Sequence, residues 1–213
     1  MPPVVSIVGK SKSGKTTLIE KLVQELKSRS YRVATIKHIP HEVNFDEPGK
    51  NSGRHLQAGS EATAVSSPDK IVLVKPVAQE ATIDEVASFL GEDYDIILAE
   101  GFERGSAPKI EVHRKDGGAL IEGLKKLIAI VTDEPLETRA RQFSPKDISA
   151  LADLLEKGFV KPQKERISFY VNNMPITLTL FPSQIISNVV LAMASCLKGV
   201  GEIQNLKIFV KKK

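Results

Sequence analysis

The chain has 213 residues, 41% of them hydrophobic, and its 30 basic residues are nearly balanced by 26 acidic ones, for a formal net charge of +4. The apolar content is enough for a buried core and excludes a disordered tail. The mild charge suits an anionic small molecule and gives no indication of nucleic-acid binding. We see no secretion signal and no apolar segment long enough to span a bilayer, so we expect a cytoplasmic protein without membrane contacts.

A glycine- and lysine-rich segment, residues 9–17, follows the first apolar run, Val4–Val8, and fits the phosphate-binding pattern G-x-x-x-x-G-K-[ST]. Helical apolar spacing over residues 18–26 follows it, so backbone N–H groups and the positive helix end would surround a phosphate. Lys15 would reach the β- and γ-phosphates, and the Thr16 hydroxyl would bind Mg²⁺. The alternative is a turn without a ligand. The expected nucleotide contacts are Gly9, Lys12, Ser13, Gly14, Lys15, Thr16 and Thr17.

Further along the chain, short apolar runs alternate with helical periodicity. A helix over 82–90 carries the capping-box pair Thr82 and Glu85, and a helix over 144–155 would begin with Ser144 as N-cap and Pro145 at its first position. Because most strands are uniformly apolar, the predicted fold class is α/β: a P-loop NTPase with a mostly parallel sheet covered by helices on both faces. The expected strands after the first are 31–36, 64–66, 70–75, 95–101, 109–113 and 127–133, and a short helix is expected within 52–59.

The composition turns to glycine, proline and charge near residues 158–164. We therefore predict two domains, a P-loop nucleotide-binding domain over 1–160 and a small α+β module over 165–213. The module has the pattern of strand, strand, helix and strand, at 166–171, 176–180, 182–198 and 206–210. About fifty residues are few for an independent core, so we expect the module to pack on the first domain or on a second subunit.

Two acids at strand ends are candidates for the nucleotide site. Glu100 ends an apolar strand, where a nucleotide-binding sheet places a carboxylate that holds Mg²⁺ through water or orients a nucleophile; the alternative is a carboxylate that only caps the strand. Asp133 follows the strand ending at Val131, where a carboxylate could accept the N1 and N2 hydrogens of guanine.

The segment 37–62 has little apolar periodicity and reads as a functional loop. Within it, Asp46 could be an outer Mg²⁺ ligand and Lys50 could meet phosphate; a charged surface loop is the alternative. The histidines His38, His41 and His55 allow either a zinc site or contacts to anions, and zinc lacks further ligands nearby. Lys10 is either solvated or acts across a subunit interface, and Arg54 or Arg104 could serve as an arginine finger.

Taken in order, several of these segments resemble the molybdopterin-guanine dinucleotide biosynthesis protein B (MobB) family over about residues 1–160. The resemblance lies in residues 9–17, the strand-Lys-His-x-x-His segment 35–41, the Asp-x-x-Gly-Lys loop 46–50, and the strand-Glu-Gly-Phe segment 97–102. It implies a homodimer that binds GTP and Mg²⁺ and hydrolyses GTP weakly. It also implies an accessory role to the guanylyltransferase that attaches GMP to molybdopterin.

By position in that family, Lys15 and Glu100 would be catalytic, Thr16 and Glu100 would hold the metal, and Asp46 with Lys50 would form the neighbouring loop. The additional C-terminal module does not follow from the resemblance, and contact with molybdopterin is open. Two alternatives remain: a P-loop kinase acting on a small metabolite, and a scaffold in which bound nucleotide only orders the loop.

Overall fold

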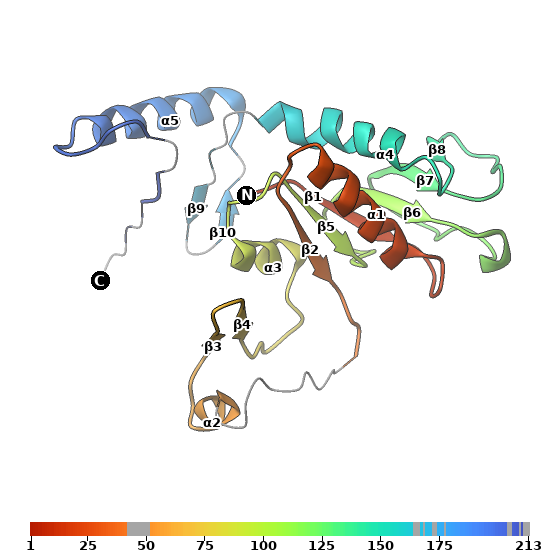
Figure 1. Cartoon of the computed structure of the whole chain (residues 1–213), viewed down its shortest axis with the longest axis horizontal. Coiled ribbons are helices and arrows are strands. Elements are labelled where there is room, and N and C mark those ends of the chain that lie inside the picture. Colours follow the sequence, from red (N-terminus) through yellow and green to blue (C-terminus); the bar gives the residue numbers. More distant parts are fainter. Residues whose placement is uncertain are drawn as a thin grey trace. The chain divides into compact units, whose positions relative to one another are not determined.

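A computed structural model describes residues 1–41, 52–163, 167, 169–171, 174–176, 178–203, 206–208 and 210 (Figure 1). The chain divides into two compact units, Pro2–Pro162 and a smaller one formed by Gln163–Lys213 with Met1. The functions assigned above to two domains stay predictions. The candidate site lies in the larger unit.

The larger unit is built on a six-stranded sheet in the order β2-β5-β1-β6-β7-β8, in which every neighbouring pair is parallel. All the carboxyl ends therefore lie at one edge, with β1 in the middle between β5 and β6. The predicted parallel α/β sheet is confirmed, and only the two-residue β8 was not predicted. The strands are β1 (Val4–Val8), β2 (Val33–Lys37), β5 (Ile96–Glu100), β6 (Lys109–Val112), β7 (Leu127–Val131) and β8 (Gln142–Phe143).

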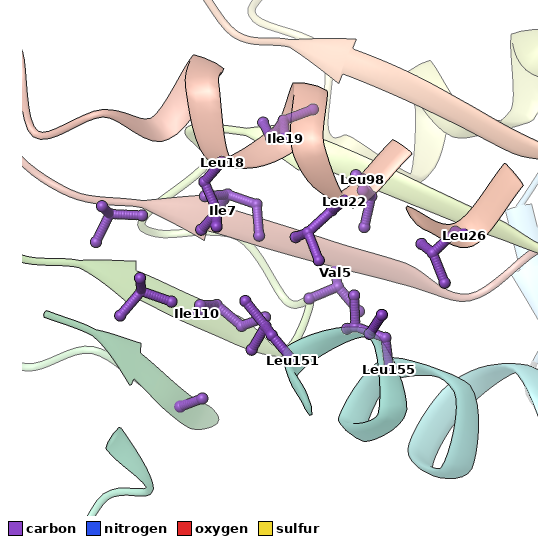
Figure 2. Packing of buried hydrophobic residues seen from close by; sticks show 14 of the residues in the cluster. Val5, Ile7, Leu18, Ile19, Leu22, Leu26, Leu98, Ile110, Leu151 and Leu155 are labelled. Carbon is purple, nitrogen blue, oxygen red and sulfur yellow. The ribbon is translucent and has the colours of Figure 1, made fainter. Parts of the chain in front are cut away.

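Two helices, α1 (Lys15–Ser28) and α4 (Ile148–Leu155), cover one face of this sheet (Figure 2). Leu18, Leu22 and Leu26 recur every four residues, so they form one stripe of α1. They pack in a buried cluster with side chains of β1, β5, β6, β7 and α4. Neighbouring side chains on a strand alternate between faces, so Glu111, between Ile110 and Val112 of this cluster, belongs to the opposite face.

The helix α3 (Ile83–Leu90) buries Ile83 and Ala87 and contacts β2. Its N-terminus has the predicted capping box. The Thr82 hydroxyl accepts a hydrogen bond from the Glu85 N–H at 3.2 Å, and the Glu85 carboxylate accepts one from the Thr82 N–H at 2.7 Å. Two N–H groups that the helix itself cannot pair are thus satisfied.

The start of α4 differs from the prediction, because the helix begins at Ile148 with Asp147 at the N-cap position. Residues 144–147 form a turn instead. The Ser144 N–H donates to the Asp147 carboxylate at 3.3 Å, and the Asp147 N–H donates to the Ser144 carbonyl at 2.9 Å. The predicted roles of Ser144 as N-cap and of Pro145 as the first helical residue are therefore both wrong.

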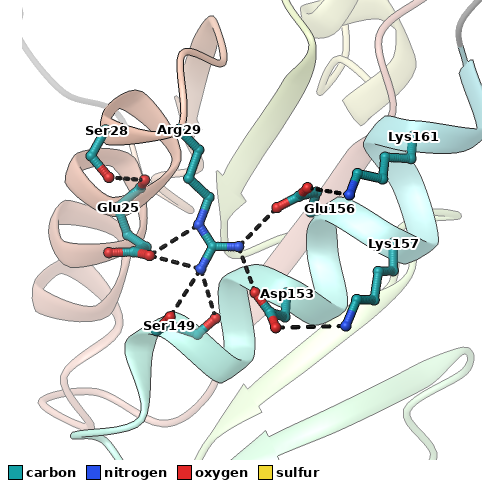
Figure 3. A network of polar contacts seen from close by, with 8 residues as sticks. All are labelled: Glu25, Ser28, Arg29, Ser149, Asp153, Glu156, Lys157 and Lys161. Atoms are coloured by element: carbon teal, nitrogen blue, oxygen red, sulfur yellow. Dashed lines mark hydrogen bonds and ion pairs between the residues drawn. The ribbon is translucent and has the colours of Figure 1, made fainter.

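A polar network around Arg29 joins the C-terminal end of α1 to α4 (Figure 3). The Arg29 guanidinium donates to Glu25 at 2.7 Å, to Asp153 at 2.6 Å and to Glu156 at 2.8 Å. Lys161 lies 2.7 Å from the other oxygen of Glu156. The Lys161 and Arg29 side chains lower the pKa of Glu156 to about 2.

Residues 52–74 form the predicted short helix and two short strands, but these strands form a hairpin separate from the main sheet. The helix is α2 (Ser52–Gln57), and β3 (Thr63–Ser66) pairs antiparallel with β4 (Ile71–Val74). The apolar side chains of β4 are unusually exposed, at 74% for Ile71 and 49% for Leu73.

In the smaller unit, β9 (Phe169–Val171) and β10 (Met174–Ile176) form an antiparallel hairpin and α5 spans Leu180–Ser195. Before it, Glu156–Val160 is a π-helical turn and Lys161–Gln163 a 3₁₀ turn, as is Lys115–Gly117 earlier in the chain. The strand predicted over 206–210 is not found at its described positions, 206–208 and 210. Within the described part of the chain, every helix falls short of the length and apolar character needed to cross a membrane.

Candidate functional site

The loop between β1 and α1 adopts a backbone conformation that requires glycine. Gly9 has φ +148°, and a Cβ there would lie 2.5 Å from the Val112 carbonyl oxygen and 2.8 Å from the Ser13 hydroxyl. No side chain fits at that distance from a backbone atom, so the loop depends on glycine at this position. Gly14 then precedes α1 as its N-cap residue. The first glycine of the motif thus lets the loop pack against the end of β6.

Lys15 and Thr16, the first two residues of α1, hold the loop and reach β5. The Lys15 ammonium donates to the Gly9 and Lys10 carbonyl oxygens, each at 2.8 Å. The Thr16 hydroxyl donates to the Glu100 carboxylate at 2.9 Å. The structure therefore brings together the three residues for which the sequence predicts the main chemistry.

The oxygens of Thr16 and Glu100 fit a Mg²⁺ ion. Mg²⁺ prefers oxygen ligands and usually binds through one or two protein groups, with waters and substrate phosphates completing its shell. No group of three or more His, Cys, Asp or Glu side chains that could hold a metal occurs among the described residues. The donor set thus suits a metal that arrives with a nucleotide, and it gives no support to the zinc alternative.

The ends of β2 and β5 meet beside this pair. Lys37 is paired with Glu100 in the sheet, and its ammonium lies 3.3 Å from the Glu100 carboxylate. The residues that follow stay close to each other: Gly101 has φ +95°, and a Cβ there would lie 3.0 Å from the His38 side chain. The His38 ring packs on Phe102 with centroids 4.6 Å apart, and it also pairs with Glu80. The Lys-His and Glu-Gly-Phe segments therefore form one packed corner.

On the other side of the loop, Arg114 follows β6 and connects three elements. Its guanidinium donates to the Ser13 carbonyl oxygen at 3.1 Å and lies 3.3 Å from the Asp133 carboxylate. The second oxygen of Asp133 accepts from the Lys115 N–H at 2.9 Å. The Lys115 N–H and the Arg114 side chain lower the pKa of Asp133. Each oxygen of Asp133 thus already accepts one hydrogen bond, so a guanine at Asp133 would share this carboxylate with Arg114 and the Lys115 N–H.

A pocket of about 440 Å³ opens between the phosphate loop and the segment after β6. Its lining includes residues 10–13 of the loop, 111–114 and Asp133. Glu111 is only 3% exposed; one of its oxygens accepts from the Ile121 N–H at 2.7 Å, and the other has no hydrogen-bond partner. The Ser13 hydroxyl is also buried without a partner. Burial raises the pKa of Glu111.

A family model described as "Molybdopterin guanine dinucleotide synthesis protein B", MobB, matches residues 4–133 of this chain. The chain belongs to the MobB family. The match spans the sheet from β1 to β7, including the phosphate loop, Glu100 and Asp133.

Two relatives in the MobB family are described as molybdopterin-guanine dinucleotide biosynthesis adapter proteins. The one from Haemophilus influenzae is 33% identical over 156 residues, covering 72% of this chain and 88% of the relative. The one from Escherichia coli is 33% identical over 167 residues, covering 76% and 95%. A related protein of Methanocaldococcus jannaschii is 26% identical over 230 residues and matches 96% of both chains. This alignment therefore extends into the C-terminal unit of the present chain.

The fold agrees with solved structures of MobB proteins. The crystal structure of a MobB homolog from Bacillus stearothermophilus superposes with a TM-score of 0.57 at 27% identity, covering 75% of this chain and 99% of that chain. The Bacillus subtilis MobB structure also gives 0.57, at 26% identity. The P-loop fold of this family implies that the chain binds a nucleotide.

Some predicted residues have no hydrogen bond to the Lys15, Thr16 and Glu100 centre, and two residues of the site were not predicted. Lys12 and Thr17 are exposed on the loop and on α1, and Asp46 and Lys50 lie outside the described residues. Sequence reasoning missed Arg114 and Glu111. For Glu111 a signal existed, because a charged residue between two apolar ones in a buried strand is unusual.

Proposed function

We propose that the chain is a GTP-binding adapter that assists the guanylyltransferase attaching GMP to molybdopterin. The names of the family and of its adapter relatives support a role in molybdenum-cofactor biosynthesis. The observation that carries the nucleotide part is the Thr16–Glu100 hydrogen bond beside Lys15, at the end of a phosphate-binding loop. We take GTP as the nucleotide and Mg²⁺ as its metal.

In this proposal each residue of the centre has one task. Lys15 leaves the Gly9 and Lys10 carbonyls and binds the β- and γ-phosphates, while Thr16 and Glu100 hold the metal. Bound Mg²⁺ neutralises charge on the phosphates. Lys12, Ser13, Gly14 and Thr17 line the nucleotide, and Asp46, Lys50 and Asp133 complete the site as further contacts.

GTP hydrolysis would be slow. Among the described residues, no arginine forms a hydrogen bond or an ion pair with Lys15, Thr16 or Glu100. The Arg114 side chain instead donates to Ser13 and pairs with Asp133. P-loop proteins without an arginine at the transferred phosphate hydrolyse slowly, and a partner that supplies one raises the rate by about 10³–10⁵. We therefore propose weak GTPase activity and a partner-dependent role, in a cytoplasmic homodimer.

The proposal is tested with the guanylyltransferase, molybdopterin and GTP in a reconstituted reaction. Lys15→Ala removes the phosphate contact, so we expect it to abolish the acceleration that the wild-type adapter gives. Lys27→Ala, at the exposed end of the same helix, is the matched control and keeps full acceleration. If Lys15→Ala accelerates guanylation as well as wild type does, nucleotide binding has no part in the adapter role.

A further inference from the structure

Two residues that line the pocket beside the phosphate loop each carry a buried polar group without a partner, and the proposed function gives neither group a hydrogen bond. They are the free oxygen of Glu111 and the hydroxyl of Ser13, and both residues line the same pocket of about 440 Å³. A buried carboxylate oxygen without a hydrogen bond is costly, and such groups are rare in folded proteins. The pocket is also large enough for a small organic ligand.

The position of Glu111 in the fold determines how its free oxygen can accept a hydrogen bond from a ligand. Glu111 lies in β6, on the face opposite to α1, and its other oxygen is held by the Ile121 N–H at 2.7 Å. This bond holds the carboxylate in place, so the second oxygen is an oriented acceptor for an N–H donor. Asp133 also lines the pocket, but both of its oxygens already accept hydrogen bonds. Asp116 lines the pocket too, but its side chain is exposed, so Glu111 is the buried carboxylate of this lining that has a free oxygen.

The other residues that line the pocket indicate which second group a ligand carries besides its N–H donor. Lys10, Lys12 and Arg114 contribute cationic side chains to the pocket. Lys10 and Lys12 are exposed, and none of the hydrogen bonds and ion pairs of the described residues occupies either side chain. A ligand that suits this pocket combines N–H donors for a buried carboxylate with an anionic group for the lysines.

We propose that the pocket binds the 2-amino-4-oxo-pyrimidine ring that guanine and the pterins share. The free oxygen of Glu111 accepts a hydrogen bond from the 2-amino group, Ser13 bonds a ring heteroatom, and Lys10 and Lys12 hold the attached phosphate. The choice of ring rests on the proposed function, in which both a guanine nucleotide and a pterin take part. The ring has two possible sources, the guanine of the nucleotide whose phosphates lie in the adjacent loop, or a separate pterin.

Calorimetric titration of the full chain distinguishes the two sources. The probes are GTP and ITP with Mg²⁺, ITP being the analogue without the 2-amino group, and pterin-6-carboxylate with its 2-oxo analogue, lumazine-6-carboxylate. Glu111→Gln keeps the acceptor for the Ile121 N–H and the shape of the side chain, and it removes the negative charge. We expect it to weaken binding of the 2-amino ring by about ten- to a hundredfold, the strength of a hydrogen bond to a charged group.

Glu111→Gln gives a different result for each source of the ring. If the ring is that of the nucleotide, Glu111→Gln weakens GTP and removes its advantage over ITP. If it is a separate pterin, Glu111→Gln weakens pterin-6-carboxylate, leaves GTP unchanged, and Lys15→Ala does not affect the pterin. If neither GTP nor the pterin loses affinity in Glu111→Gln, the pocket holds water only and the inference is wrong.

A second variant keeps the inference testable if Glu111→Gln does not fold. Lys10→Gln changes an exposed side chain whose backbone carbonyl, the acceptor for Lys15, remains, and we expect at least a threefold loss for the same anionic ligand. Lys125→Gln, an exposed lysine outside the pocket, is the matched control. Unchanged affinity in Lys10→Gln would also count against the inference. Failure of the proposed function is a separate result, namely that GTP does not bind or that Lys15→Ala leaves its affinity unchanged.

Discussion

Thr16 and Glu100 are 84 positions apart in the chain, yet their side chains share a hydrogen bond of 2.9 Å. Both could be predicted, because the phosphate-loop motif identifies Thr16 and the carboxyl end of an apolar strand identifies Glu100. Glu111 and Arg114 could not be placed in the same way. They lie near the phosphate loop only because β6 is next to β1 in the sheet. Local periodicity in the sequence does not predict the order of the strands.

The Thr16–Glu100 pair predicts a metal-dependent effect on nucleotide affinity. Thr16→Val removes one oxygen of the proposed Mg²⁺ shell and Glu100→Gln removes the negative charge of the other, so we expect each to weaken GTP binding by about tenfold when Mg²⁺ is present. Because they share one ion, the double variant should lose less than the product of the two. Titrations repeated with excess EDTA provide the control. Equal losses with and without the metal would mean that the pair does not act through Mg²⁺.

Single elements were predicted well where their signals are local and strong. The capping box at Thr82 and the apolar stripe of α1 are examples. The start of α4 was wrong because Ser144 and Asp147 bond to each other's backbone and form a turn, a competing use of the same residue types that favour helix N-caps. The strand β8 has two residues, too few for any periodicity, and it exists only through its pairing with β7.

The junction of α1 and α4 predicts a pH dependence of stability. Lys161 and Arg29 lower the pKa of Glu156 from 4.5 to about 2. A carboxylate with a lowered pKa stabilises the fold above its unfolded-state pKa, and this contribution is lost as the pH falls from about 4.5 through about 2. We expect Glu156→Gln to lower the thermal unfolding midpoint at pH 7 by about 2–6 °C.

The difference between Glu156→Gln and wild type should then shrink steadily below pH 4.5 and vanish near pH 2. Thermal melts between pH 7 and pH 2 measure it. Glu137→Gln, which changes an exposed acid in the loop before β8, should match wild type at every pH. If the unfolding midpoint of Glu156→Gln lies as far below that of wild type at pH 2 as at pH 7, the residue acts by packing and not by its charge.

At the scale of the whole molecule, the exposed hairpin β3–β4 gives the proposed homodimer a physical basis. A two-stranded hairpin is at best marginally stable alone, and exposed apolar clusters usually mark contact surfaces. The smaller unit also exposes large apolar side chains, with Phe181 at 72%. Composition could not tell which of the two surfaces is covered in an assembly.

We expect the hairpin to form the dimer contact. Leu73→Asp places a charge on β4, so the protein should sediment as a monomer at concentrations at which wild type is a dimer. Phe181→Asp, the matched change in the smaller unit, should leave the dimer intact. Analytical ultracentrifugation measures both, and a monomer for Phe181→Asp with a dimer for Leu73→Asp would assign the contact to the smaller unit instead.

The central claim is that the loop between β1 and α1 is a guanine-nucleotide site. Calorimetric titration of the full chain with GTP and with ATP, each with Mg²⁺, tests it most directly. The account predicts that GTP binds at least about tenfold more tightly than ATP and that Lys15→Ala loses both. ATP binding as tight as GTP, or GTP binding that survives Lys15→Ala, would contradict it.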